Sequence, residues 1–184
     1  MNNLLTILFG AILVMSFRKE VHTINSNPKS ITIAQIDTSV IAIIPSDSSL
    51  DWVNYLFNYK CKSAELNTND LSNIASLLTD CIKQYNKSQE KKINKIKREN
   101  PKNKYDKNNF IIDLKRYKRQ YIAVANEKGE KEVWINCFCN DSHNSNINWK
   151  KEILMVKGGG NCYFNVKVNL MTKNYYDFKT NNDE

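Results

Sequence analysis

The cysteines are the residues whose types and spacing most readily support chemistry. There are five of them: Cys61, Cys81, Cys137, Cys139 and Cys162. Cys137 and Cys139 are two residues apart on a predicted strand, where alternate side chains share a face, so both are expected to point the same way. Three interpretations are open: a disulfide from one of this pair to Cys162, a metal site that includes His143, or free thiols buried in an apolar core. The first two cysteines could also pair with each other, and the odd total leaves at least one unpaired in a monomer.

One histidine, His143, lies close enough in sequence to these cysteines to act with them. A cysteine nucleophile needs a general base, so the enzyme hypothesis is a thiol-dependent or hydrolytic enzyme that uses Cys137 or Cys139 with His143. A metal site with His143 as fourth ligand would lack the paired ligand knuckles of zinc sites. We therefore predict no metal site and no cofactor, and we favour a protein that is not an enzyme.

Arg119 is the best single candidate for binding. It lies between Tyr117 and Tyr121 on one face of a predicted strand, and a guanidinium flanked by aromatic rings can bind a carboxylate or a phosphate. The alternative is that the stem of Arg119 packs across the two tyrosines and serves only the fold. Together with Trp134 on the following strand, these residues form the predicted binding set. The three aromatic rings of the set should line any ligand pocket.

The elements that position these residues begin with one helix. Apolar residues recur at spacings of three and four from Leu71 to Tyr85 and form a stripe that must be buried. Thr68 or Asn69 is the predicted N-cap, and the helix continues or restarts through a polar stretch that ends before Pro101. Aromatic residues between Trp52 and Tyr59 predict one or two further helical turns against the core.

Short apolar and aromatic runs separated by Gly, Asn and Lys turns indicate a sheet. The predicted strands are Val40–Ile44, a strand within Phe110–Ala125, Val133–Cys139, Glu152–Val156, Cys162–Leu170 and Tyr175–Phe178. The Gly158–Gly160 run is predicted as a hairpin turn, because no helix follows it as a phosphate loop requires. The predicted fold is therefore α+β: one amphipathic helix packed on a four- to five-stranded antiparallel sheet, similar in broad shape to cystatin and nuclear-transport-factor-type folds.

The N-terminal residues suggest export. The apolar run from Leu4 to Phe17 is too short to span a bilayer, which needs about twenty residues, but it suits the hydrophobic region of a secretory signal. We predict a signal peptide at residues 1–16, a flexible leader at 17–30, a single domain at 31–180, and a periplasmic or extracellular location. The alternative is an uncleaved membrane anchor at residues 4–17, because the flanking Arg and Lys follow the apolar run instead of preceding it.

The chain is basic, with 27 Lys and Arg against 19 Asp and Glu and a formal net charge of +8. Much of this charge lies between Lys91 and Lys107, where it indicates a solvated helix end and loop more than a nucleic-acid surface. Binding of an anionic polymer by this segment is the third hypothesis, and no nucleic-acid partner is favoured.

Three motifs carry a resemblance to a known group of proteins. They read Y-x-R-Q-Y at Tyr117–Tyr121, W-x-N-C-F-C at Trp134–Cys139 and G-G-x-N-C-Y-F at Gly159–Phe164. With the segment Ala42–Trp52, they make the chain similar to a family of small bacterial exported proteins that has no assigned activity. The resemblance implies export and names no site residues. Our first hypothesis is therefore a noncatalytic exported or envelope-associated protein that binds a protein or a small ligand.

Overall fold

The computed structural model of the 184-residue chain describes residues 37, 39–46, 50–140 and 147–181. All of them belong to one unit of the chain, Ile33–Glu184. The predicted signal peptide, the predicted leader and His143 lie outside the described residues. The expectations that rest on them, export among them, therefore stay predictions.

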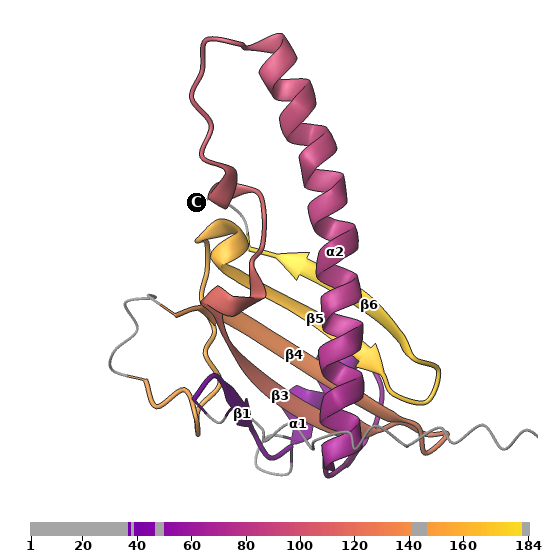
Figure 1. Ribbon diagram of the computed structural model, residues 1–184. Helices are drawn as coiled ribbons and strands as arrows, with labels where there is room; N and C mark the ends of the chain where they lie inside the picture. The colour runs from indigo at the N-terminus through magenta and orange to yellow at the C-terminus, as the bar shows by residue number, and fades with distance from the viewer. Residues whose placement is uncertain (1–36, 38, 47–49, 141–146, 182–184) are drawn as a thin grey trace, which may run out of the picture. The chain divides into compact units, whose positions relative to one another are not determined.

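The long helix α2 (Thr68–Glu99) crosses one face of the sheet, and its C-terminal half extends beyond it (Figure 1). A capping box fixes its start: the Asn67 side chain accepts a hydrogen bond from the Asp70 amide at 2.9 Å, and the Asp70 carboxylate accepts one from the Asn67 amide at 3.0 Å. The N-cap is therefore Asn67, and the predicted N-caps, Thr68 and Asn69, are wrong. In a capping box the acidic residue, here Asp70, stands three positions after the N-cap. The predicted end before Pro101 is confirmed.

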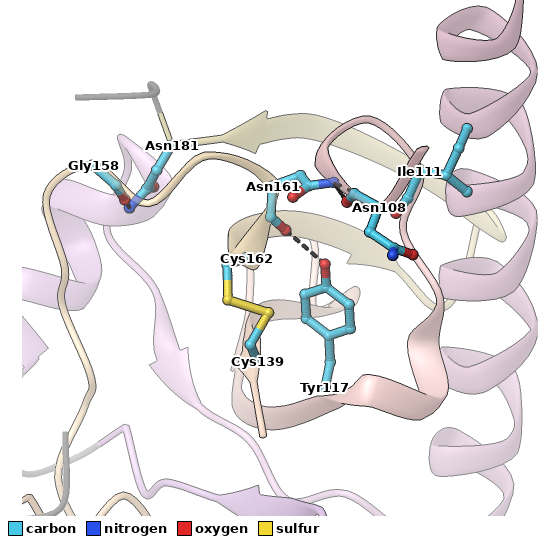
Figure 2. Close-up of a disulfide and its surroundings, with 8 residues drawn as sticks. All are labelled: Asn108, Ile111, Tyr117, Cys139, Gly158, Asn161, Cys162 and Asn181. Carbon is cyan, nitrogen blue, oxygen red and sulfur yellow. Dashed lines mark hydrogen bonds between the residues drawn. A yellow bond between two sulfur atoms is a disulfide. The ribbon is translucent and has the colours of Figure 1, made fainter. Parts of the chain in front are cut away.

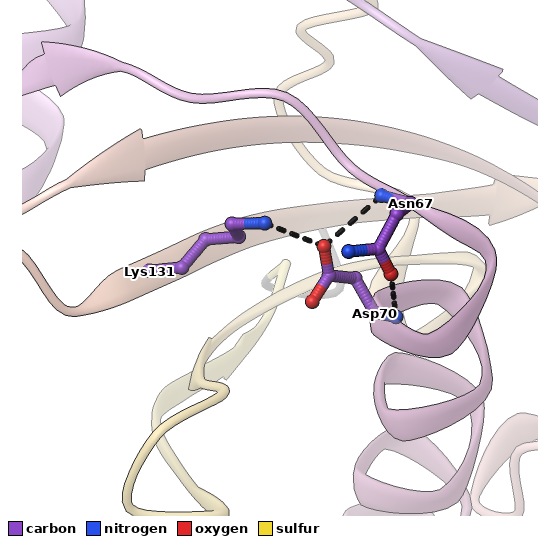
Figure 3. Close-up of polar contacts among 3 residues, drawn as sticks. All are labelled: Asn67, Asp70 and Lys131. Carbon is purple, nitrogen blue, oxygen red and sulfur yellow. Dashed lines mark hydrogen bonds and ion pairs between the residues drawn. The ribbon is translucent and has the colours of Figure 1, made fainter.

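Four consecutive antiparallel strands form most of the sheet: β3 (Tyr117–Ala125), β4 (Lys131–Cys139), β5 (Tyr163–Asn169) and β6 (Asn174–Thr180). The predicted turn between the first two is confirmed, with Gly129 at a φ of +78°, a value that an L-residue rarely adopts. Lys131, at the start of β4, pairs with Asp70 at 2.5 Å (Figure 3). This ion pair fixes the start of α2 to the edge of the central hairpin.

The prediction of a purely antiparallel sheet is wrong, because β1 (Ile41–Ile43) lies parallel to β3. Parallel neighbours need a long connection, and here the chain passes through both helices before it returns as β3. A two-residue strand, β2 (Lys62–Ser63), pairs antiparallel with the other end of β3 and was not predicted. Among the described residues the result is a mixed six-stranded sheet: five strands follow the order β1-β3-β4-β5-β6, and β2 lies off this path and pairs with β3.

The sheet is covered on both faces, and the prediction of a single helix is incomplete. The face under α2 carries the larger core, which includes Ile74, Leu78, Ile82, Tyr121, Ile135, Phe164 and Val166. The short helix α1 (Leu50–Phe57) covers the other face, as the aromatic spacing predicted. The core on that face includes Val53, Phe57, Cys61, Ile122, Val124 and Trp134. We call these the α2-face core and the α1-face core.

The predicted strand Glu152–Val156 is not a strand, and β5 pairs directly with β4 instead. The backbone groups of this segment form hydrogen bonds with buried amide side chains instead of with a neighbouring strand. Gln120 donates through Nε2 to the carbonyls of Trp149 and Glu152, each at 2.6 Å, and its Oε1 accepts from the Leu154 amide at 3.0 Å. Asn136 donates to the Leu154 carbonyl at 2.8 Å and to Gln120 Oε1 at 3.0 Å. The segment is thus held over the sheet by side chains.

Within the described part of the chain, none of the helices combines the length and the apolar character that crossing a membrane requires.

Candidate binding cleft

Two of the three predicted binding residues on β3 are buried in the core. Tyr117 and Tyr121 are buried in the α2-face core at 4% and 1% exposure. The Tyr117 hydroxyl donates to the Asn161 carbonyl at 2.7 Å, and burial raises the pKa of Tyr121 to about 12. Arg119 is half-buried and donates through Nη2 to the Leu114 carbonyl at 2.9 Å. Its buried Nε finds no hydrogen-bond partner among the described residues.

Trp134, the fourth predicted residue, lies on the opposite face of the sheet. It is 2% exposed in the α1-face core, where its ring meets the edge of Trp52 at a centroid distance of 5.6 Å. Register explains the separation: Trp134 pairs with Ile122, whereas Tyr121 pairs with Ile135. Cross-strand partners share a face. The four predicted residues therefore do not line a common pocket.

The structure divides the cysteines into one disulfide and three free thiols. Cys139 is bonded to Cys162 with their Cα atoms 5.1 Å apart, which confirms the disulfide interpretation. Cys137 is free, fully buried, and held protonated by burial, which raises its pKa well above the usual range. Cys61 and Cys81 do not pair, because they belong to the α1-face and α2-face cores respectively.

This arrangement leaves no accessible thiolate where the enzyme hypothesis needs one. One cysteine of the predicted pair is oxidised, the other is enclosed, and His143 is outside the described residues. No group of three or more His, Cys, Asp or Glu side chains that could hold a metal ion occurs in the portion of the chain that the structure covers.

The disulfide anchors a corner of the molecule where several loops meet, and we call it the disulfide corner: residues 158–162 with Cys139 and Asn181. Figure 2 shows Asn161 and Asn181 on either side of the sulfur atoms. Asn161 donates to the Asn108 carbonyl at 3.0 Å, and Asn181 donates to the Gly158 carbonyl at 3.0 Å. The corner thereby joins the end of the sheet to the loop that follows α2.

Glycine is required within this corner. Gly159 has a φ of +81°, and a Cβ there would stand 2.7 Å from the ring of Tyr163. The conformation and the close approach both exclude larger residues. The G-G-x-N-C-Y-F motif thus contributes a tight turn, one hydrogen bond to Tyr117 of β3, one to the loop after α2, and one half of the disulfide.

A cleft of about 470 Å³ lies between the disulfide corner, the projecting half of α2 and the loop after it. Its lining residues are Tyr85, Gln89, Lys92, Lys104, Tyr105, Asp106, Asn109, Phe110, Gly160, Asn161, Thr180 and Asn181. The loop is fastened to α2 by a pair of hydrogen bonds between the Asn86 side chain and the backbone of Ile112, at 2.8 and 2.9 Å. The loop that lines the cleft is therefore held both to α2 and to the disulfide corner.

The cleft combines positive charge with aromatic surface. Lys92 and Lys104 are exposed and form no ion pair with any described residue. The single acidic residue of the lining, Asp106, accepts a hydrogen bond from the Asn108 amide at 2.9 Å and so caps a short 3₁₀ turn. The rings of Tyr105 and Phe110 are half-buried. Such a site can pair an anionic group with two ammonium groups while a ring stacks beside it.

Sequence reasoning missed this cleft. It treated residues 102–109 as a connecting loop, and the lining comes from four separate segments of the chain. The one signal in the sequence was the high density of lysine, which does not by itself show which lysines lack an acidic neighbour.

A second polar cluster, also missed, surrounds the buried carboxylate of Glu132 on the α1 side of the sheet. Tyr59 donates to it at 2.8 Å, Tyr176 donates to the same oxygen, and Asn126 and Asn169 donate to the other oxygen at 2.8 and 3.2 Å. All four donors are tied to the carboxylate, which is 6% exposed. The cluster fastens α1 and β6 to the central hairpin and offers no open position for a ligand.

Comparisons of the chain with protein-family models, with curated proteins and with solved structures found no match. The resemblance to small bacterial exported proteins stays a prediction.

Proposed function

We propose that the protein is a noncatalytic exported protein that binds a small anionic, ring-bearing ligand in the cleft beside the disulfide corner. The observation that carries the proposal is the pair of lysines, Lys92 and Lys104, which face one cleft without an acidic partner among the described residues. A ligand carboxylate or phosphate would supply the missing counter-charge.

The dimensions and the lining agree with this assignment. The volume of about 470 Å³ falls within the range of small-molecule sites, roughly 300–1,000 Å³. Tyr105 and Phe110 supply apolar surface for a sugar or aromatic ring, and the amides of Gln89 and Asn109 supply donors and acceptors for hydroxyl groups. The ligand class is thus a uronic acid, a sugar phosphate or an aromatic acid.

Two further observations support the noncatalytic and exported parts of the proposal. The candidate nucleophiles of the enzyme hypothesis are a disulfide-bonded Cys139 and an enclosed Cys137 with a raised pKa. Disulfides persist in oxidising compartments, which agrees with the predicted signal peptide.

The test is calorimetric titration of the purified chain with glucuronate, glucose 6-phosphate and benzoate, with glucose as the uncharged control. We expect saturable binding of at least one anion and none of glucose. Lys92→Gln with Lys104→Gln should abolish the binding, whereas the matched pair Lys60→Gln with Lys62→Gln, exposed on another part of the chain, should not. The proposal is refuted if no anion binds up to about 10 mM, tenfold above a Kd of roughly 1 mM, or if both pairs act alike.

A further inference from the structure

A row of cations follows the outward face of α2, away from the cleft. Lys83, Lys87, Lys91 and Arg98 are exposed and fall at spacings of four, four and seven residues, which places them on one side of the helix. At 1.5 Å of rise per residue, the row is about 22 Å long. We call it the cationic row.

The row is unfavourable for the helix that carries it. Lys83, Lys87 and Lys91 form successive like-charge pairs at a spacing of four, and such pairs destabilise a helix. Polar uncharged residues at these positions would be better for folding alone. The arrangement therefore leaves the positive charge of the row available to an external anion.

The acidic residues nearby do not supply a counter-charge for the row. Glu90 pairs with Lys107 at 3.7 Å, and Glu99 pairs with Lys95 at 3.9 Å, so both carboxylates face lysines outside the row. No ion pair to Lys87, Lys91 or Arg98 is formed within the described part of the chain. Residues 87–107 contain nine Lys and Arg against three Asp and Glu, which accounts for most of the net charge of +8.

Two shallow, largely open surface depressions along the row meet at Lys91. One, of about 420 Å³, is lined by Gln84, Lys87, Ser88 and Lys91, and the other, of about 560 Å³, by Lys91, Asn94, Lys97 and Arg98. Amide and hydroxyl groups thus alternate with cations along a shallow groove. Neither lining includes an aromatic or aliphatic residue.

We infer that the cationic row binds a linear anionic polysaccharide, whose carboxylate or sulfate groups meet the cations and whose hydroxyls meet Gln84, Ser88 and Asn94. Single-stranded nucleic acid is less suited, because its binding sites stack bases on aromatic rings. A lipid surface is less suited, because helices that lie on membranes insert apolar side chains. The inference concerns a different surface from the cleft and does not depend on the ligand proposed for it.

The test is titration of the full chain with polygalacturonate and with heparin, which separate carboxylate from sulfate recognition, at about 50 and about 200 mM NaCl. The test variant replaces Lys87, Lys91 and Arg98 with Gln. The matched control replaces Lys60, Lys62 and Lys128 with Gln, which removes the same charge from exposed positions elsewhere. We expect the test variant to weaken binding by roughly tenfold or more and to reduce the slope of log K against log salt by about three, one for each cation.

Thermal unfolding gives a second readout. Removing the like-charge pairs should leave the Tm of the test variant unchanged or higher, so weaker binding cannot be blamed on misfolding. Equal losses in test and control variants, or none in either, would overturn the inference. It would also be overturned if oligothymidylate or phosphatidylglycerol vesicles bound as tightly as both polysaccharides with the same dependence on the row.

Discussion

The side chain of Gln120 gives a direct test of how the α1 side of the sheet is closed. Gln120 is fully buried and makes four hydrogen bonds: to the carbonyls of Trp149 and Glu152, to the Leu154 amide and to the Asn136 side chain. Gln120→Leu has a similar volume and removes all four. At about 1 kcal/mol net for each hydrogen bond, the expected loss in the free energy of unfolding is about 4 kcal/mol.

That loss is large against the total of about 5–15 kcal/mol expected for a domain. Asn136→Leu removes two hydrogen bonds and should cost about 2 kcal/mol. Because the two residues share one bond, the double variant should cost about 1 kcal/mol less than the two single losses added together. Gln84→Leu, the same substitution at an exposed helix position, should stay within about 0.5 kcal/mol.

Urea unfolding followed by tryptophan fluorescence measures these differences, provided that the m-value stays constant. Limited proteolysis of residues 147–157 gives an independent measure, because Gln120→Leu should release this segment and Gln84→Leu should not. A Gln120→Leu loss below about 1 kcal/mol, or strict additivity with Asn136→Leu, would refute the reasoning that buried side-chain amides hold the segment in place.

Two further expectations concern the disulfide and the buried tyrosines. Cys139→Ser opens a loop with a sequence separation of 23 residues and should lower the free energy of unfolding by about 3 kcal/mol. The free energies of unfolding of oxidised and reduced wild-type protein, measured with urea, should differ by a similar amount. Identical unfolding curves would contradict the stabilising role of the disulfide. Burial raises the pKa of Tyr121 from 10.0 to about 12, so the stability that this group contributes is complete below pH about 10 and is lost as the pH rises toward 12. The Tm should fall across that interval, and a Tm that is constant from pH 9 to 12 would count against the burial.

The elements with strong local patterns could be predicted from the sequence. The apolar stripe from Leu71 to Tyr85 and the alternation around Gly129 each specify an element through nearby residues alone. Glu152–Val156 has the composition of a strand but is not one, because its backbone bonds to Gln120 and Asn136. Local composition does not reveal which distant side chain will form a hydrogen bond with a given backbone group.

In the candidate sites, too, some features could be predicted from the sequence and others depend on contacts between distant residues. The sequence showed the lysine-rich segment, the pair of cysteines of which one becomes bonded to Cys162, and the aromatic residues of β3 and β4. Cross-strand register placed Trp134 and Tyr121 on opposite faces, and no property of either residue alone contains that information. The cleft likewise forms only because folding brings Lys92 and Lys104 next to the disulfide corner.

The sequence by itself determined the α+β class, the existence of α2 and its end before Pro101, the central hairpin and the concentration of positive charge, because each depends on neighbours within a few turns or strands. Only the tertiary structure decided that β1 runs parallel to β3, that Cys139 and not Cys137 is oxidised, and which lysines lack a counter-charge. These features depend on contacts between residues far apart in the chain, and such contacts exist only after the chain has folded.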